Sequence, residues 1–359
     1  MPVDQLVTFK SSPFSLLADE TTAPCWAGRK QTLAQLRRLC ASWSNRADSS
    51  LDVMWANLGA GKTHALFHLK YLLTAPFAST SLPIVTFVDV PEDIANFLEL
   101  YKKILPTLPL RQLAELGLKT SYAKSTVRLS RAFRAMVFGS ESEQRLAYDW
   151  IAGGRPGLRE LKAITGIDSR IETDSDAESV LSELVRLSAS NGQRFVILLD
   201  EFQRIGHIRI EKKRDALMAH LRTLFSRNPT QLSLVLAIGS RLEKTALDLL
   251  APELRTIMGM RPSISLPELN KEEALEFVTQ RFAWYRPEGY SGSALHPFTP
   301  RQVQFVISYL ADQTQTRLIP RAILQVLGIV YDNFLSTGKI ECSDEELSDL
   351  LKSLRWDDA

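Results

Sequence analysis

The chain is poor in cysteine and in long apolar runs, and each shortage excludes a class of protein. Its three cysteines, Cys25, Cys40 and Cys342, lie far apart and pair with no histidine at metal-ligand spacing. Disulfide frameworks and structural zinc are therefore not expected, whereas reduced thiols in a cytoplasmic compartment are. The first residues form no apolar signal core, and no window is apolar for long enough to cross a bilayer. We expect a cytoplasmic protein that does not insert into a membrane.

Charge of one sign is also scarce. The formal net charge is only +2 over 359 residues, so binding of a polyanion would have to come from a local basic patch. This length is sufficient for two packed domains, or for one enlarged α/β domain with a helical appendage.

What the chain does contain is a glycine-rich turn between an apolar strand and an apolar-periodic helix. The apolar run from Leu51 to Ala56 predicts a buried strand, and the turn that follows contains Gly59, Ala60 and Gly61. Small residues let several backbone N–H groups converge on a phosphate, and the start of the helix adds its dipole. The usual pattern opens with glycine where this chain has Ala56, which is small enough that we expect only a slight change in the turn.

Two residues after the turn complete the pattern of a phosphate-binding loop. Lys62 is placed to reach the β- and γ-phosphates of ATP, and the hydroxyl of Thr63 to ligate Mg²⁺. A chance glycine-rich turn before a basic helix cap is the alternative, but the strand before the turn and the helix after it favour the nucleotide. The predicted nucleotide contacts are Asn57, Leu58, Gly59, Ala60, Gly61, Lys62, Thr63 and His64.

A second motif is an acidic pair at the end of another buried strand. Five apolar residues follow Arg194 and lead to Asp200 and Glu201. Ligands of open α/β sheets bind at the carboxyl ends of strands, so Asp200 is placed to hold Mg²⁺ and Glu201 to polarise the attacking water. The pair favours hydrolysis over binding alone. We expect it to face the phosphate loop across adjacent strands, with the metal between them.

A third buried strand, from Leu232 to Ile238, ends in Gly239, Ser240 and Arg241. A polar residue here can bond the attacking water or the γ-phosphate, so Ser240 is a candidate sensor of the nucleotide. A simple turn at the end of the strand is an equally good interpretation.

The order of the elements predicts a three-layer α/β/α core around a central parallel sheet, with a helical insertion and a C-terminal helical lid. We expect an N-terminal arm at 1–24 laid over the first domain, a core at 25–265 with the insertion at about 106–190, and the lid at 266–359. The expected helices outside the motifs are Glu92–Leu105, Arg111–Leu118, Ser125–Phe138, Glu143–Ala152, Ser175–Ala189, Asp215–Phe225, Lys271–Tyr285, Thr299–Leu310, Pro320–Leu335 and one capped by Ser343.

Two local basic segments interrupt the charge balance. Lys212, Lys213 and Arg214 are expected in a loop before a helix and are the candidate contacts to DNA. The insertion carries a longer basic run: Arg111, Lys119, Lys124, Arg128, Arg131 and Arg134. A solvated helix face is the first interpretation of that run, and a nucleic-acid surface is the second.

With both motifs, the polar strand end and the lid in this order, the chain resembles the AAA+ ATPases, and within them the initiator-like branch of origin-recognition ATPases. Trp26-Ala27-Gly28-Arg29 is similar to the "V-G-R" box of that branch, and Leu318-Ile319-Pro320-Arg321 to the "x-P-R" signature of its lid. The chain also resembles the ATP-binding proteins of bacterial BREX-type phage-defence loci, in the segments Tyr148-Asp149-Trp150-Ile151 with Gly153-Gly154, Leu199-Asp200-Glu201-Phe202 and Pro320-Arg321.

The resemblance implies roles for four arginines. Arg321 would reach the γ-phosphate and report its loss as a movement of the lid. Arg255 and Arg261 are candidates for an arginine finger given to the nucleotide of a neighbouring subunit, and Arg241 is a third. A surface ion pair is the alternative for each. A finger given to a neighbour implies a homo-oligomer, a ring or spiral with ATP between subunits.

The sequence leaves more than one function open. The first is a Mg²⁺-dependent ATPase oligomer that acts on or with DNA in defence, transposition or replication control. The second is a nucleotide-gated signalling or scaffold switch of the STAND type, with a protein partner bound through the insertion. A remodelling ATPase that threads proteins is disfavoured, because no aromatic-glycine pore motif precedes Asp200.

Overall fold

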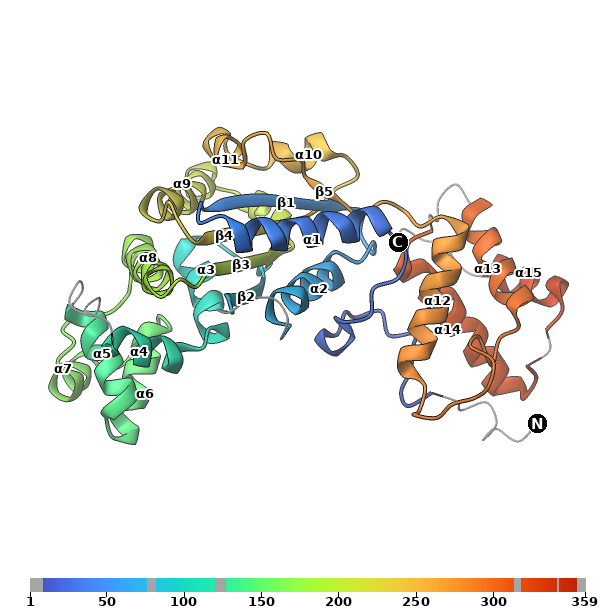
Figure 1. Cartoon of the computed structure of the whole chain (residues 1–359), viewed down its shortest axis with the longest axis horizontal. Helices are drawn as coiled ribbons and strands as arrows, with labels where there is room; N and C mark the ends of the chain where they lie inside the picture. The colour runs from blue at the N-terminus through green and yellow to red at the C-terminus, as the bar shows by residue number, and fades with distance from the viewer. Residues whose placement is uncertain (1–8, 76–81, 120–126, 313–317, 341, 354–359) are drawn as a thin grey trace. The chain divides into compact units, whose positions relative to one another are not determined.

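The computed structural model describes residues 9–75, 82–119, 127–312, 318–340 and 342–353, which divide into two compact units (Figure 1). The first unit is built from 1–37, 56–71 and 265–359, and the second from 38–55 and 72–264. Each unit has its own apolar core. In the ranges that the structure describes, no helix is both long and apolar enough to span a bilayer.

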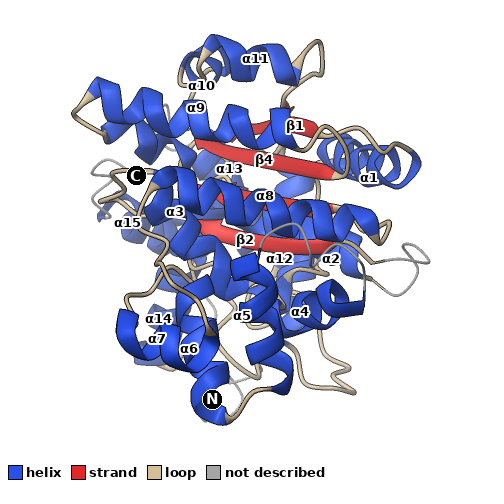
Figure 2. Ribbon diagram, turned by 90° about the vertical axis from the view of Figure 1, so that its left-hand side faces the viewer, coloured by secondary structure: helices blue, strands red, loops and turns tan. Residues whose placement is uncertain are grey.

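A five-stranded parallel sheet forms the centre of the second unit (Figure 2). The strands are β1 Ser50–Ala56, β2 Ile84–Asp89, β3 Phe195–Asp200, β4 Leu232–Gly239 and β5 Ile264–Ser265, in the order β2-β3-β4-β1-β5. Every residue of β3 is buried, as the continuous apolar run predicts for a parallel strand covered on both faces. The predicted α/β class is therefore confirmed. The edge strand β5 was not predicted, because two residues carry no periodic signal.

The interval between β2 and β3 is helical, as predicted. The helices of the second unit are α3 Phe97–Ile104, α4 Leu110–Lys119, α5 Val127–Phe138, α6 Glu141–Ile151, α7 Leu158–Thr165, α8 Asp174–Ser190, α9 Glu211–Arg227, α10 Glu243–Asp248 and α11 Pro252–Met258. The short helices α7, α10 and α11 were not predicted, since six to eight residues give little periodicity. Lys124 of the predicted basic run lies outside the described residues.

Two predicted helix starts are wrong, for reasons visible in the structure. Helix α3 begins at Phe97 rather than Glu92, because the side chain of Asn96 accepts a hydrogen bond from the backbone N–H of Glu99 (2.9 Å) and caps the helix there. Helix α9 begins at Glu211 rather than Asp215. Its basic residues, Lys212, Lys213 and Arg214, therefore lie in the first helical turn and not in a loop.

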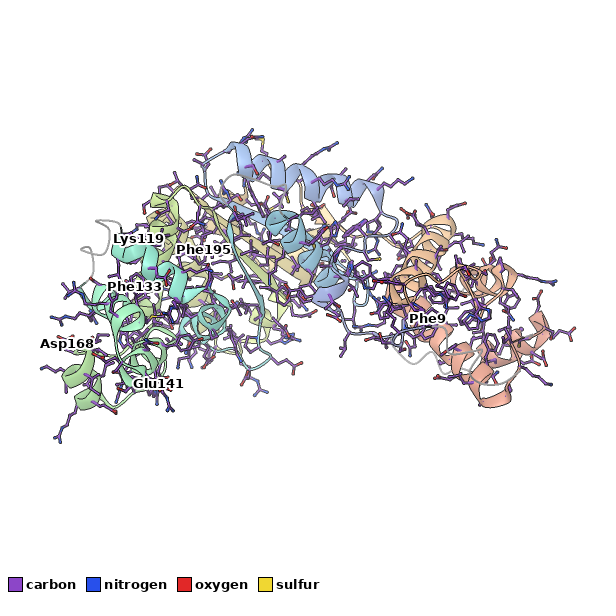
Figure 3. All side chains as sticks on the ribbon, turned by 60° about the horizontal axis from the view of Figure 1, so that its bottom comes forward. Phe9, Lys119, Phe133, Glu141, Asp168 and Phe195 are labelled. Carbon is purple, nitrogen blue, oxygen red and sulfur yellow. The ribbon has the colours of Figure 1, made fainter. Side chains whose placement is uncertain are left out.

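The core of the second unit runs without interruption from the sheet into the insertion. Phe195 at the start of β3 and Phe133 in the middle of α5 belong to this same core (Figure 3). The hydroxyl of buried Tyr101 in α3 donates a hydrogen bond to the carbonyl of Ile151 at the end of α6. The insertion is thus packed onto the sheet as part of one folded unit.

The first unit contains the predicted helical lid. Its helices are α2 Lys62–Thr74, α12 Lys271–Tyr285, α13 Pro300–Asp312, α14 Pro320–Thr337 and α15 Asp344–Ser353, and α1 Lys30–Asn45 begins in it. Two predicted caps in the lid are confirmed: Asn270 forms a capping box with Glu273 at the start of α12, and Gly338 ends α14 in the left-handed conformation.

The N-terminal arm contacts two parts of the first unit. The rings of Phe9 and Phe14 pack on Phe282 in the lid, with centroids 5.1 and 5.7 Å away. Further along the arm, Thr22 and Ala23 offer backbone carbonyls to side chains of α2. The arm therefore contacts the lid as well as the helix after the phosphate loop, whereas the sequence analysis placed it over the first domain alone.

Candidate functional site

The phosphate loop spans Asn57 to Gly61, between the end of β1 and the start of α2 at Lys62. Gly59 and Gly61 have φ angles of +74° and +96°, a conformation that glycine adopts without strain. An α-helix leaves its first N–H groups without an acceptor inside the helix, and in α2 these groups lie at the loop. Lys62 is buried, and its Nζ lies 3.5 Å from the carbonyl of Asn57.

The lid touches this loop at the predicted Arg321. The backbone N–H of Arg321 donates a hydrogen bond to the carbonyl of Gly59 (3.3 Å). A Cβ at Gly59 would come within 2.9 Å of the Cβ of Arg321 and 3.2 Å of Ile319. Close packing therefore requires glycine here for a second reason, besides its φ angle.

A second arginine at the loop, Arg29, received no role from the sequence beyond its place in the "V-G-R" box. Its Nη1 donates a hydrogen bond to the carbonyl of Ala60 (2.6 Å), and its backbone N–H donates to the carboxylate of Glu273 (2.6 Å). Burial lowers the pKa of Arg29 to about 10, against the opposing effect of Glu273, so the side chain remains a cation at neutral pH. The signal in the sequence is a glycine and an arginine directly before a helix.

The acidic pair lies at the carboxyl end of β3. Asp200 is buried, and one of its carboxylate oxygens accepts a hydrogen bond from the backbone N–H of Glu201 (2.9 Å). Glu201 has a φ of +53°, which is unusual for a residue other than glycine and is found at functional sites. The side-chain amide of Gln203 donates to the Glu201 carboxylate, and this glutamine was not singled out in the sequence.

The order of the strands corrects one expectation. Strand β1, which ends directly before the phosphate loop, is separated from β3 by β4. The two motifs therefore do not follow adjacent strands. The sequence gives the chain order of the motifs, but the crossover connections decide which strands become neighbours. Since the sheet is parallel, β1, β4 and β3 all end at the same edge.

Comparisons with known proteins agree with this arrangement. Residues 101–239 match the family described as "BREX system ATP-binding protein BrxC/D". Among solved structures, the ORC2 protein of Aeropyrum pernix, described with ADPNP and ADP, matches with a TM-score of 0.56 at 14% identity, over 90% of this chain and 67% of that one. No curated protein sequence matches the chain.

Two further archaeal structures have the same fold. The ORC1 protein of Aeropyrum pernix, described in complex with DNA, matches with a TM-score of 0.53 at 15% identity, over 95% of this chain and 69% of that one. Cdc6p of Pyrobaculum aerophilum matches with a TM-score of 0.50 at 15% identity, over 94% of this chain and 72% of that one. The fold is that of an initiator-type AAA+ ATPase. The predicted resemblance, to this branch and to the BREX proteins, is confirmed.

The hydroxyl of Ser240, the candidate sensor, forms hydrogen bonds with the backbone of Leu242 two residues later. This hydroxyl donates to the carbonyl of Leu242 (2.8 Å) and accepts from the N–H of the same residue (3.2 Å). The polar contact between the end of β4 and the acidic turn is made instead by Gln203, whose side-chain oxygen accepts from the N–H of Gly239 (2.7 Å). A role for Ser240 at the nucleotide stays a prediction.

The candidate finger arginines form ion pairs within the chain. Arg255 in α11 lies 3.3 Å from Asp248. The Nη1 of Arg261 lies 3.9 Å from Oδ2 of Asp52. Asp52 is buried, and burial raises the pKa of its carboxyl despite the opposing effect of this arginine. Arg241 is exposed after β4. The alternative interpretation, an ion pair within the chain, fits Arg255 and Arg261, and a finger role stays a prediction for all three.

His64, a predicted nucleotide contact, should make the stability of the folded protein depend on pH. Its Nε2 lies 3.2 Å from the carbonyl of Thr22, and burial lowers its pKa to about 4. The unfolded chain therefore binds a proton near pH 6.5 that the folded protein takes up only near pH 4, so stability is lost as pH falls between these values. We expect His64→Gln, which can keep the hydrogen bond, to lose roughly 3 kcal/mol less over this range in denaturant unfolding. Equal pH dependence in both proteins would contradict it.

Proposed function

We propose that the chain is a Mg²⁺-dependent AAA+ ATPase that hydrolyses ATP, assembles as a homo-oligomer, and acts on or with DNA in a bacterial defence, transposition or replication-type process. The observation that carries the proposal is a phosphate loop after β1 and an acidic turn with buried Asp200 after β3, two strands of one parallel sheet in which β4 lies between them. The match to BREX ATP-binding proteins over 101–239 supports the defence process.

In this proposal the phosphates are held by the loop backbone and by three cations. Lys62 at the start of α2 bonds the β- and γ-phosphates, and Arg321 reports the γ-phosphate to the lid. Arg29 adds a charge beneath the loop, and its Nε and Nη2 are buried without a hydrogen-bond partner in the described part of the chain. Glu201 orients and polarises the water that attacks the γ-phosphate, with the nucleotide contacts completed by Asn57, Leu58, Thr63 and His64.

The residues present fit a magnesium ion that arrives with the nucleotide. Mg²⁺ in phosphoryl-transfer sites keeps several waters and takes one or two protein ligands besides phosphate oxygens. Asp200, a carboxylate at the end of β3, and the hydroxyl of Thr63 are ligands of that kind. Across the described ranges no three His, Cys, Asp or Glu side chains form a metal site of their own. The ion would neutralise charge that develops on the phosphates.

The homo-oligomer is proposed from the arginines after β4. Arg255 and Arg261 are both partly exposed. Arg255 pairs with Asp248 and donates to the carbonyl of Leu250. Arg261 pairs with the buried Asp52. An exposed ion pair such as that of Arg255 contributes about 1 kcal/mol or less, so a neighbour's γ-phosphate can compete for this arginine. ATP bound between subunits would then stabilise the assembly.

The DNA contact is proposed at the first turn of α9. Lys212 and Lys213 are exposed there, next to Arg214, at a helix end where the dipole disfavours cations. Their placement therefore costs the helix stability, but it puts two charges beside N–H groups that can bind a phosphate. The relative from Aeropyrum pernix described in complex with DNA supports this partner.

The experiment that tests the proposed function is size-exclusion chromatography with light scattering, with ATP, ADP or no nucleotide, each with and without duplex DNA. We expect ATP to increase the mass, and duplex DNA to bind the ATP form and stimulate hydrolysis. A mass and an ATPase rate that ignore both ligands would reject the proposal.

The contact to DNA is tested with Lys212→Glu/Lys213→Glu. We expect this variant to bind duplex about tenfold or more weakly, and the slope of log affinity against log salt to fall by about 2, because two phosphate contacts are lost. The matched control, Lys271→Glu/Lys339→Glu, reverses two exposed charges of the lid. If instead Arg131→Glu/Arg134→Glu on α5 carries the loss, the basic run of the insertion binds the DNA and the assignment to α9 is wrong.

A nucleotide-gated switch that acts through a protein partner is the second candidate, and the surface of α5 favours it. Val127, Arg131, Arg134 and Phe138 follow one another at helical spacing, and the two apolar ends of this stripe are 60% and 75% exposed. An acidic partner segment with apolar ends would complement it. This candidate predicts very slow turnover and nucleotide that stays bound through purification.

A further inference from the structure

The acidic turn after β3 is followed at once by a residue that links it to the next strand. Gln203 lies in the 3₁₀ helix η5, Phe202–His207, which begins directly after Glu201. Its side-chain nitrogen donates to the Glu201 carboxylate, and its side-chain oxygen accepts the N–H of Gly239 at the end of β4 (2.7 Å). One amide thus joins the carboxylate of β3 to the backbone of β4.

We propose that Gln203 is the positioning residue of the hydrolysis step: it fixes the orientation of the Glu201 carboxylate and ties that orientation to the end of β4. The inference rests on the proposed function, since it assigns Glu201 the activation of water. It goes beyond that function because the contact to β4 passes through Gln203 and not through Ser240, whose hydroxyl is bonded to Leu242.

The Glu201 carboxylate must be held in one orientation to activate water. The backbone of Glu201 is left-handed, and Asp200 accepts a hydrogen bond from the N–H of that backbone rather than contacting the carboxylate through this bond. A carboxylate on three rotatable bonds would sample several orientations, and a misplacement of about 1 Å can cost about 100-fold in rate. An amide is the suitable neighbour, since it donates to the carboxylate with one end and accepts from a backbone N–H with the other.

The other strand beside β3 is held by the next residue in the chain. The guanidinium of Arg204 donates to the carboxylate of Asp89 at the end of β2 (2.7 Å) and to the carbonyl of Val90. Consecutive residues of η5 therefore reach the ends of both neighbours of β3. Arg204 does not bond the Glu201 side chain in the described structure. The side chain of Arg204 therefore contacts the end of β2, whereas Gln203 is the residue that orients the Glu201 carboxylate.

Gly239 leaves the space that the amide occupies. A Cβ added at this position would lie 2.9 Å from Nε2 and 3.2 Å from Cδ of Gln203. The atoms in the way belong to the end of a flexible side chain, so alanine at 239 should displace the amide rather than unfold the strand. Gly239→Ala is therefore a way to break the link while Gln203 is still present.

The test measures kcat and KM for ATP and the affinity for ATP in Gln203→Ala, Gly239→Ala and Gln203→Glu. We expect the first two to lose about 10- to 100-fold in kcat, with KM and affinity within about twofold of the parent. Gln203→Glu keeps an oxygen that can accept from the N–H of Gly239 but has no donor for the Glu201 carboxylate, so we expect it to lose kcat as Gln203→Ala does. Gln193→Ala is the matched control, because it removes a glutamine bonded to Leu82 before the start of β3.

The outcomes separate this inference from the function on which it rests. Unchanged kcat in both Gln203→Ala and Gly239→Ala overturns the positioning role, and so does an equal loss of kcat, ATP affinity and thermal stability, which would mark a purely structural contact. A parent protein that does not hydrolyse ATP, or whose rate survives Glu201→Gln, overturns the proposed function instead.

Discussion

Glu201→Gln should lower the turnover of ATP by about 100-fold or more while leaving the affinity for ATP within about twofold of the parent. The amide has the shape of the carboxylate but does not accept a proton from water, and a positioned general base contributes roughly 10²- to 10⁴-fold. The neighbouring contacts should persist, because Gln203 can still donate to the remaining side-chain oxygen. The protein would therefore bind ATP and keep it, and the oligomer formed with ATP should accumulate.

Two measurements check this result: single-turnover hydrolysis, and the mass of the assembly after ATP addition. Glu253→Gln is the matched control, since it makes the same change at an exposed position of α11. A variant that hydrolyses ATP at more than about a tenth of the parental rate would show that another group activates the water.

Lys62→Ala should weaken ATP binding by about 100-fold or more. A hydrogen bond to a charged group contributes roughly 1.5 to 3 kcal/mol, and the ammonium group is placed to contact two phosphates. Because Lys62 is buried at the first residue of α2, the loss acts inside the phosphate loop, and alanine keeps the helix propensity high. Nucleotide-dependent assembly should disappear together with binding.

Isothermal titration with ATP and ADP measures this effect directly. Lys70→Ala is a suitable control on the same helix, because that lysine is paired with Glu20 (2.6 Å). ATP bound equally by the Lys62 and Lys70 variants would mean that the loop does not hold the phosphates.

The elements that sequence reasoning placed correctly are those with strong local signals. The strand before Asn57 is apolar except at Ser50 and Asp52, the strand that ends at Asp200 carries a continuous apolar run, and Gly338 is the usual left-handed end of a helix. The loop glycines were also recognisable, because their spacing from Lys62 reflects a backbone conformation that only the local chain determines.

The features that were missed depend on contacts distant in sequence. The role of Gln203 is visible only from its hydrogen bond with Gly239 of another strand, and that of Arg29 only from its hydrogen bond to the carbonyl of Ala60. Local sequence patterns also do not predict that β4 lies between β1 and β3. Hydrogen bonds and strand order of this kind arise from the tertiary fold, so a reading of periodicity and motif spacing cannot supply them.

The contact between Gly59 and Arg321 shows that the attachment of the lid to the loop and the charge of Arg321 depend on different atoms. In the described part of the chain, the backbone N–H of residue 321 attaches the lid to the loop by a hydrogen bond, and the Cβ and Cδ of the same residue lie beside Gly59. Alanine at 321 would therefore keep the hydrogen bond and the Cβ contact while it removes the charge and its methylene groups. To uncouple the lid from the loop, one must change the main chain at that turn, for instance by denying it the hydrogen-bonding amide.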